Sequence, residues 1–247
     1  MYADLHHGEH AGARAGEGGA GMRFLRQAGL MLWKDLVVEF RARDVLTAMV
    51  FFACMVVLVF SLAFVRDGRP VGDVAGGILW VSLAFSGALG LGRNFERERE
   101  ADTLHGLLMS PADRGAILVG KALGVTVFMS VTAAVVAPLI AVLFDAPLGR
   151  DPLPLALLLL LGSFGFAIVG AIFGTLLLKA RARDVLLAVI LYPLTVPALI
   201  AGTVGTSALL DARPQPGRAW FWIQALSAFD LIFLVVALWA FEALTTE

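Results

Sequence analysis

The stretch that decides the fold is Arg93–Lys121, RNFEREREADTLHGLLMSPADRGAILVGK, the longest polar interruption in an otherwise apolar chain. It holds ten charged side chains, and uncharged runs lie directly before it (74–92) and after it (122–144). Each run is long enough to cross a bilayer as a helix. The stretch must therefore connect two spanning helices through water.

The composition is that of an integral membrane protein. Of the 247 residues, 59% are hydrophobic and 16% charged, and the mean hydropathy is +0.85, whereas soluble domains are about 25% charged. The net charge of −1 gives no reason to expect a nucleic-acid partner. The single cysteine, Cys54, excludes an internal disulfide and a cysteine-based metal site.

Six uncharged runs predict an all-α fold with six transmembrane helices. They are 45–65, 74–92, 122–144, 155–178, 185–210 and 219–241, the last interrupted by Asp230. From Arg23 onward, the segments on one side of these helices hold thirteen Lys and Arg, and those on the other side hold five. Because basic residues accumulate in the cytoplasm, we expect both termini and the Arg93–Lys121 stretch to be cytoplasmic.

Two segments precede the first span. Residues 1–22 are rich in Gly and Ala, and we expect a disordered tail or an upstream mis-start, with the six-helix domain covering 23–247. Arg23–Asp44 has an amphipathic helical pattern, with basic side chains on one face and leucines on another. We expect this helix to lie in the cytoplasmic interface of the bilayer.

The long polar stretch contains the pattern of a short helix between two bends. The residues that define it are two caps, three leucines of one face and a Ser-Pro stop: Asp102, Thr103, Leu104, Leu107, Leu108, Ser110 and Pro111. A helix this short is not stable alone in water. Its leucines must be covered by the flanking helices, by the membrane surface or by a groove in a partner protein, and the surrounding charge argues against the membrane.

A near match to a phosphate-binding P-loop follows, in which Gly115, Gly120 and Lys121 are followed by Ala122. The Ser or Thr that binds magnesium is missing, the intervening residues AILV are apolar, and no strand precedes them. We expect instead a helix entering the membrane, with Lys121 at the headgroups.

Small and polar residues mark the spans. Ser82, Ser86 and Gly90, like Gly170 and Gly174, recur at four-residue steps that allow close helix packing. A second set, Pro193 and Pro197, predicts a kinked or broken helix.

Asp230 is the intramembrane polar candidate, because an aspartate at the bilayer centre costs about 3 kcal/mol. Either it faces a polar interior, or residues 219–228 form an irregular segment at the outer interface. We expect no catalytic residues, since the sequence shows no nucleophile with a base and no paired carboxylates. We also expect no metal site, because His6, His7 and His10 lie in the expected tail.

The segments LWKDLVVEFRARDVLTAMVFF (32–52) and GGILWVSLAFSGALGLGRNFEREREADTLHGLLMSPADRGAILVGK (76–121) resemble the haem exporter protein B (CcmB) family. Members are permease subunits of the bacterial ABC transporter of cytochrome c maturation. The resemblance runs from about Met22 to the C-terminus. It implies a type-2 ABC exporter-like permease in the bacterial inner membrane, with Thr103–Met109 as the coupling helix.

The resemblance further implies a separate cytoplasmic ABC ATP-binding subunit that holds the ATP, and a haem-handling membrane subunit. Haem would be the substrate, delivered at the periplasmic side, and no cofactor would be bound by this chain alone. The sequence leaves open whether the chain forms a homodimer. We expect membrane lipid to surround it. Two other functions also stay open: a type-2 ABC permease for a lipid, glycan or drug, and a membrane scaffold without transport of its own.

Overall fold

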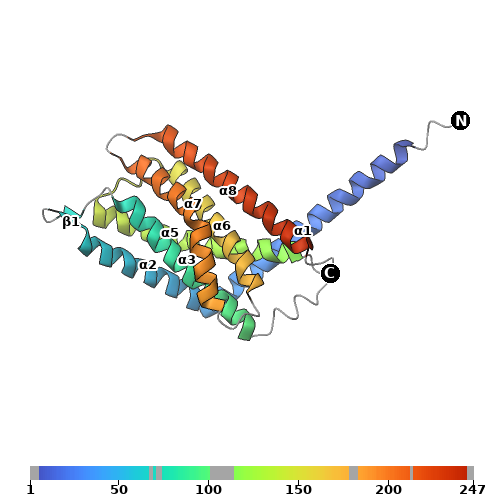
Figure 1. Cartoon of the computed structure of the whole chain (residues 1–247), viewed down its shortest axis with the longest axis horizontal. Coiled ribbons are helices and arrows are strands. Elements are labelled where there is room, and N and C mark those ends of the chain that lie inside the picture. Colours follow the sequence, from blue (N-terminus) through green and yellow to red (C-terminus); the bar gives the residue numbers. More distant parts are fainter. Residues whose placement is uncertain are drawn as a thin grey trace.

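The computed structural model describes residues 6–66, 69–70, 74–100, 114–177, 183–211 and 214–243, and helices dominate this part of the chain (Figure 1). The helices are α1 (His6–Ala42), α2 (Asp44–Ala63), α3 (Ala75–Glu100), α5 (Arg114–Phe144), α6 (Pro152–Leu176), α7 (Arg183–Leu210) and α8 (Pro216–Ala243). Strands β1 (Val65–Arg66) and β2 (Arg69–Pro70) pair antiparallel between α2 and α3. Within the described residues, six helices are long and apolar enough to span a membrane: α2, α3, α5, α6, α7 and α8. The predicted six-span all-α fold is confirmed.

The centre of the bundle consists of α3 and α6. About two-thirds of the residues in the most apolar part of each of these helices are buried inside the protein, whereas less than a third are buried in α2 and in α8. The outer helices instead expose large apolar side chains, such as Phe51 on α2 and Trp239 on α8, as helices facing lipid do. Successive spans run in opposite directions, so the short hairpin lies at one end of the bundle and the α1–α2 junction at the other (Figure 1).

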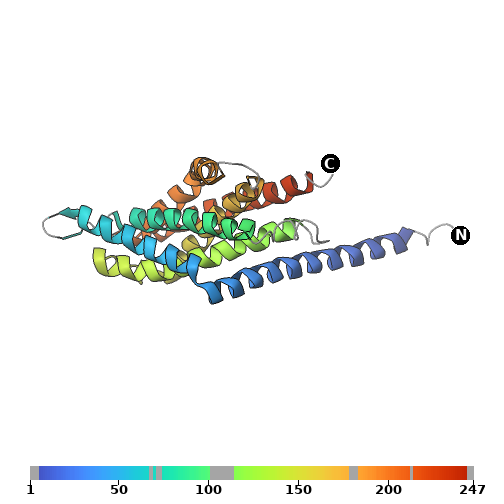
Figure 2. The same cartoon turned by 90° about the horizontal axis from the view of Figure 1, so that it is seen from below.

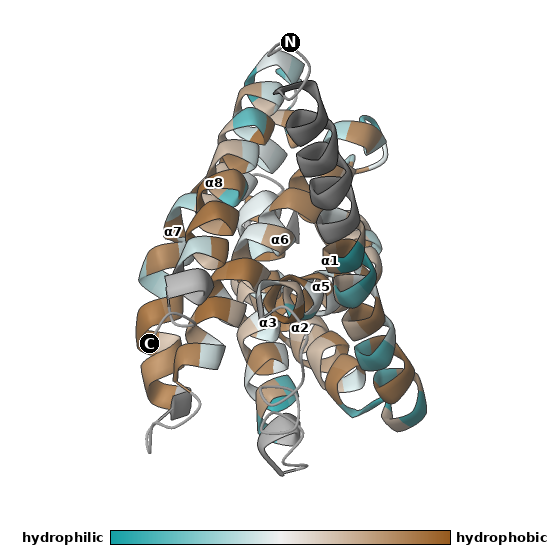
Figure 3. Ribbon diagram, turned by 90° about the vertical axis from the view of Figure 1, so that its right-hand side faces the viewer, coloured by the Kyte–Doolittle hydropathy of each residue, from teal (hydrophilic) through white to brown (hydrophobic). Residues whose placement is uncertain are grey.

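α1 is a long helix that packs against α5 with its C-terminal half and extends beyond the bundle with its N-terminal half (Figure 2). Figure 3 shows teal, hydrophilic turns concentrated on α1, whereas the spans are mostly brown. Ala28 and Met31 are buried where α1 meets Gly120 of α5, and a Cβ at Gly120 would overlap them. The chain then turns at Arg43, whose φ of 57° is left-handed, before α2 begins.

In the structure residues 6–22 belong to helix α1, and the expected tail or mis-start at 1–22 stays a prediction. The sequence from His6 to Ala42 has no proline. Proline is the residue most unfavourable to a helix, so its absence is compatible with one continuous helix, although the six glycines from Gly8 to Gly21 each cost about 1 kcal/mol relative to alanine.

Trp80 of α3 fixes the packing of three central helices. Its indole is 1% exposed, its Nε1 donates a hydrogen bond to Thr206 Oγ1 of α7 at 3.0 Å, and its ring lies on Gly162 of α6 and Gly202 of α7. A Cβ on either glycine would overlap the ring. The two glycines therefore allow α6 and α7 to hold the indole between them.

The small-residue steps serve packing, as predicted. Gly90 of α3 receives Met49 of α2. On α6, Gly170 and Gly174 receive Leu91 and Phe95 of α3.

The two prolines do not break α7, which runs without interruption from Arg183 to Leu210. Thr195, between them, donates its hydroxyl to the carbonyl of Leu191 at 2.8 Å. This bond does not replace those that the prolines remove, because Pro193 and Pro197 leave the carbonyls of Val189 and Pro193 without their helical donors.

Candidate functional site: the frame of segment 101–113 and the buried carboxylates

The seven predicted loop residues, from Asp102 to Pro111, lie outside the described residues. The structure does describe the helices that lead into and out of this segment. α3 continues through FERERE to Glu100, and α5 begins at Arg114, eight residues before the predicted start of its span. The segment 101–113 is therefore framed by two helices.

These helices are longer than a bilayer requires. α3 has 26 residues and α5 has 31, or about 39 and 46 Å at 1.5 Å per residue. The hydrocarbon core is only about 30 Å thick. Both helices are therefore long enough to extend beyond the hydrocarbon where α3 ends and α5 begins, and so to hold segment 101–113 outside it.

Where α3 and α5 enter the bundle, Phe95 of α3 and Lys121 of α5 are in contact. Lys121 Nζ lies 5.5 Å from the centroid of the Phe95 ring, an arrangement worth about 0.5 to 2 kcal/mol depending on desolvation. The Cδ2, Cε2 and Cζ atoms of the ring pack on Gly174 of α6. Contacts at this point join α3, α5 and α6.

The same contact corrects one expectation and confirms another. Lys121 is 2% exposed, so its side chain is not free to extend toward lipid headgroups; it is buried against Phe95, and Gly174 leaves room for that ring. Gly115, Gly120 and Lys121 all lie within helix α5. The near match to a P-loop is a helix, as predicted.

Asp230 lies inside the bundle on α8. It is 5% exposed, and both carboxylate oxygens are buried without a hydrogen-bond partner among the described residues. The carboxylate faces Gly165 of α6, where a Cβ would lie 2.5 Å from Oδ1.

Of the two interpretations of Asp230, an irregular outer segment at 219–228 is wrong. α8 is one continuous helix from Pro216 to Ala243, and it buries Ala219, Ile223 and Leu226 on the same face as Asp230. An ionisable group at such a depth marks a functional candidate by default.

Two further carboxylates were not singled out from the sequence. Asp35 and Glu39 of α1 are 6% and 4% exposed. Asp35 Oδ1 lies 3.1 Å from Lys34 Nζ, and Oδ2 is buried without a partner among the described residues. Both follow Ala28 and Met31 on one helical face, so the three- and four-residue spacing was the signal that could have found them.

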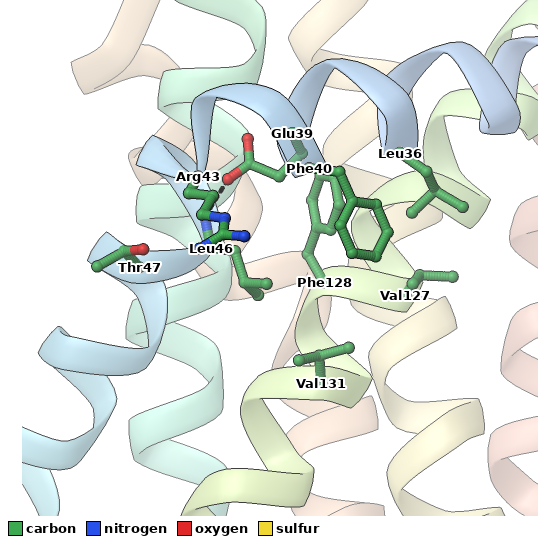
Figure 4. A pocket seen from close by; sticks show the side chains of 9 residues that line it. All are labelled: Leu36, Glu39, Phe40, Arg43, Leu46, Thr47, Val127, Phe128 and Val131. Atoms are coloured by element: carbon green, nitrogen blue, oxygen red, sulfur yellow. Dashed lines mark hydrogen bonds between the residues drawn. The ribbon is translucent and has the colours of Figure 1, made fainter.

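Glu39 fixes the turn between α1 and α2. Its Oε1 accepts a hydrogen bond from the backbone N–H of Leu46 at 2.7 Å, which Figure 4 shows as a dashed line. That N–H belongs to the first turn of α2, where donors have no partner within the helix. Glu39 thus caps α2 from the preceding helix.

Comparison with known proteins places the chain in a family. The sequence model of the CcmB protein family matches residues 26–246. The chain belongs to the CcmB family. Heme exporter protein B of Pseudomonas aeruginosa is 27% identical over 203 residues, which cover 82% of this chain and 90% of the relative. Heme exporter protein B of Rhodobacter capsulatus is 29% identical over 172 residues, which cover 70% and 78%.

The family match covers every element that frames the site: most of the described C-terminal half of α1, the six spans and the segment 101–113. Together with the six apolar helices, it identifies a multi-pass bacterial membrane protein. Among the residues that the structure describes, no three His, Cys, Asp or Glu side chains come together as a metal site would require.

Proposed function

We propose that this CcmB-family chain is the permease subunit of a haem-exporting ABC transporter. ATP is bound and hydrolysed by a separate cytoplasmic subunit, and a haem-handling membrane subunit completes the complex. Both termini and segment 101–113 are cytoplasmic in this proposal, and haem is handled at the periplasmic side. The relatives named heme exporter protein B support the substrate.

The observation that carries the coupling part of the proposal is the frame around segment 101–113. α3 and α5 are long enough to hold it outside the hydrocarbon, and Phe95 and Lys121 join them to α6 at their base. A push on the segment would therefore reach three helices of the bundle. The sequence pattern adds the element that is pushed, a short helix whose leucines fit a groove in the ATPase.

The test is a pull-down of the tagged full chain with its co-expressed ATPase. Leu104→Ala with Leu108→Ala removes about 1.5 to 3 kcal/mol of burial per fully buried leucine. We expect binding to weaken at least tenfold, with membrane insertion unchanged. Glu98→Ala is the control and should change little, since we expect that charge to be solvated. Wild-type affinity and normal cytochrome c maturation with the double variant would refute the coupling role.

A further inference from the structure

A pocket lies at the corner where α1, α2 and α5 meet. Its volume is about 230 Å³. The residues that line it come from all three helices: Leu36, Glu39, Phe40, Arg43, Leu46, Thr47, Val127, Phe128 and Val131 (Figure 4). Most of these side chains are apolar, and the charged ones come from the last turn of α1 and the α1–α2 turn.

The pocket sits at the boundary of a span. Arg43 and Asp44 are the last charged residues before the uncharged run of α2, while Val127 and Val131 belong to the spanning part of α5. One end of the pocket is therefore level with the headgroups, and the other reaches into the hydrocarbon. Phe40 and Val131 are 76% and 40% exposed, so the pocket is open to the surrounding membrane.

The charged groups of the pocket are not equivalent. Glu39 is engaged by the backbone of α2 through Leu46. The Arg43 guanidinium points toward the space between Leu46 and Phe128 (Figure 4), and the described residues give it no ion pair or side-chain hydrogen bond. Arg43 is exposed and lines the pocket beside the Glu39 carboxylate, and a guanidinium without an ion pair next to an apolar cavity can bind a phosphate with paired N–H donors.

We propose that this pocket binds one membrane glycerophospholipid, with an acyl chain among its apolar side chains and the phosphate on Arg43. A free phosphate would leave the apolar part of the cavity uncovered. An apolar side chain from a partner protein would leave the guanidinium without an anion. A phospholipid supplies both an acyl chain for the apolar side chains and a phosphate for Arg43, and its phosphate lies at the level of the headgroups.

The lipid would also hold the turn at Arg43. It would contact Phe40 of α1, Leu46 of α2 and Val131 of α5 at once, and so join the helices on either side of the left-handed residue. This role is independent of the substrate and of the ATPase.

Native mass spectrometry of the purified full chain, titrated with phosphatidylglycerol, tests the proposal. Arg43→Gln should weaken binding of the phospholipid about tenfold, the loss expected for a charge-assisted hydrogen bond. Arg43→Lys should retain much of it. The matched control is Arg41→Gln, an exposed cation in the last turn of α1 that does not line the pocket.

A second pair of variants tests the apolar part. Val131→Trp should fill the pocket and displace the lipid, whereas Val135→Trp, one turn further along α5 and also exposed, should not. Phospholipid binding that is equal in wild type, Arg43→Gln and Val131→Trp would overturn the proposal. So would an equal loss in Arg43→Gln and Arg41→Gln, which would mean that lipid is attracted by surface charge alone.

Discussion

Replacing Gly202 by alanine tests the packing around Trp80. The new Cβ would lie 2.5 Å from Trp80 Cζ2 and nearer still to Cε2. The indole cannot move away easily, because Thr206 holds its Nε1 and Gly162 contacts its far edge. Overpacking of this kind costs about 1 to 3 kcal/mol, while alanine gains about 0.5 to 1 kcal/mol over glycine in a helix. We expect a net loss of about 1 to 2 kcal/mol in the free energy of unfolding.

The assay is equilibrium unfolding of the purified chain in mixed micelles, followed by circular dichroism. Gly77→Ala is the matched control, because its Cβ would meet only Thr203 Cγ2 at 3.9 Å, an ordinary contact with the same helix α7. It should leave stability unchanged or slightly raised. The double variant Trp80→Phe, Gly202→Ala should show a coupling of at least ~0.5 kcal/mol, since the smaller ring leaves room for the methyl group.

The result that refutes this reasoning is equal stability for Gly202→Ala and Gly77→Ala. Additive effects of Trp80→Phe and Gly202→Ala would refute it as well. Either outcome would mean that the indole does not fill the space between α6 and α7.

Three further predictions follow from the same structure and sequence. In a Cys54→Ala background, single cysteines at Gly68, Gly149 and Gln215 should react with an impermeant maleimide from outside and one at Glu100 should not; the reverse pattern would exclude cytoplasmic termini. The chain purified alone should neither hydrolyse ATP nor show a bis-histidine haem spectrum, and stoichiometric haem with that spectrum would contradict this. Asp230→Asn should raise the free energy of unfolding, because a buried amide costs less than an unpartnered buried carboxylate; a lower value would mean that Asp230 has a partner in the membrane.

The spans could be predicted from the sequence because hydropathy and helix length are local properties. The ends of α3 and α5 could not, since Glu96 to Glu100 and Lys121 interrupt an apolar run without ending a helix. Glu and Arg are good helix formers, so the backbone continues past the point where the chain leaves the hydrocarbon.

The candidate site was predictable only in part. The isolation of Asp230 in an apolar run was visible, but its contact with Gly165 depends on how α8 packs on α6. The burial of Lys121 depends in the same way on Phe95 fitting Gly174. Both features are tertiary, and each involves residues more than 20 positions apart. The seven loop residues lie outside the described part of the chain and stay a prediction.

The contacts between α3 and α6 determine how a movement of segment 101–113, driven by the proposed ATPase, would be transmitted to the other helices. α3 touches α6 at three glycines along its length, through Trp80 on Gly162, Leu91 on Gly170 and Phe95 on Gly174. Each of these side chains occupies the space where its glycine lacks a Cβ. If α3 slid along α6 by less than a helical turn, the side chains would therefore collide with α6. The pair should therefore move as one rigid body, because close-packed interfaces have discrete arrangements and do not deform continuously. On its α8 side, α6 contacts Asp230 at Gly165, so a tilt of the α3–α6 pair would change the surroundings of that carboxylate.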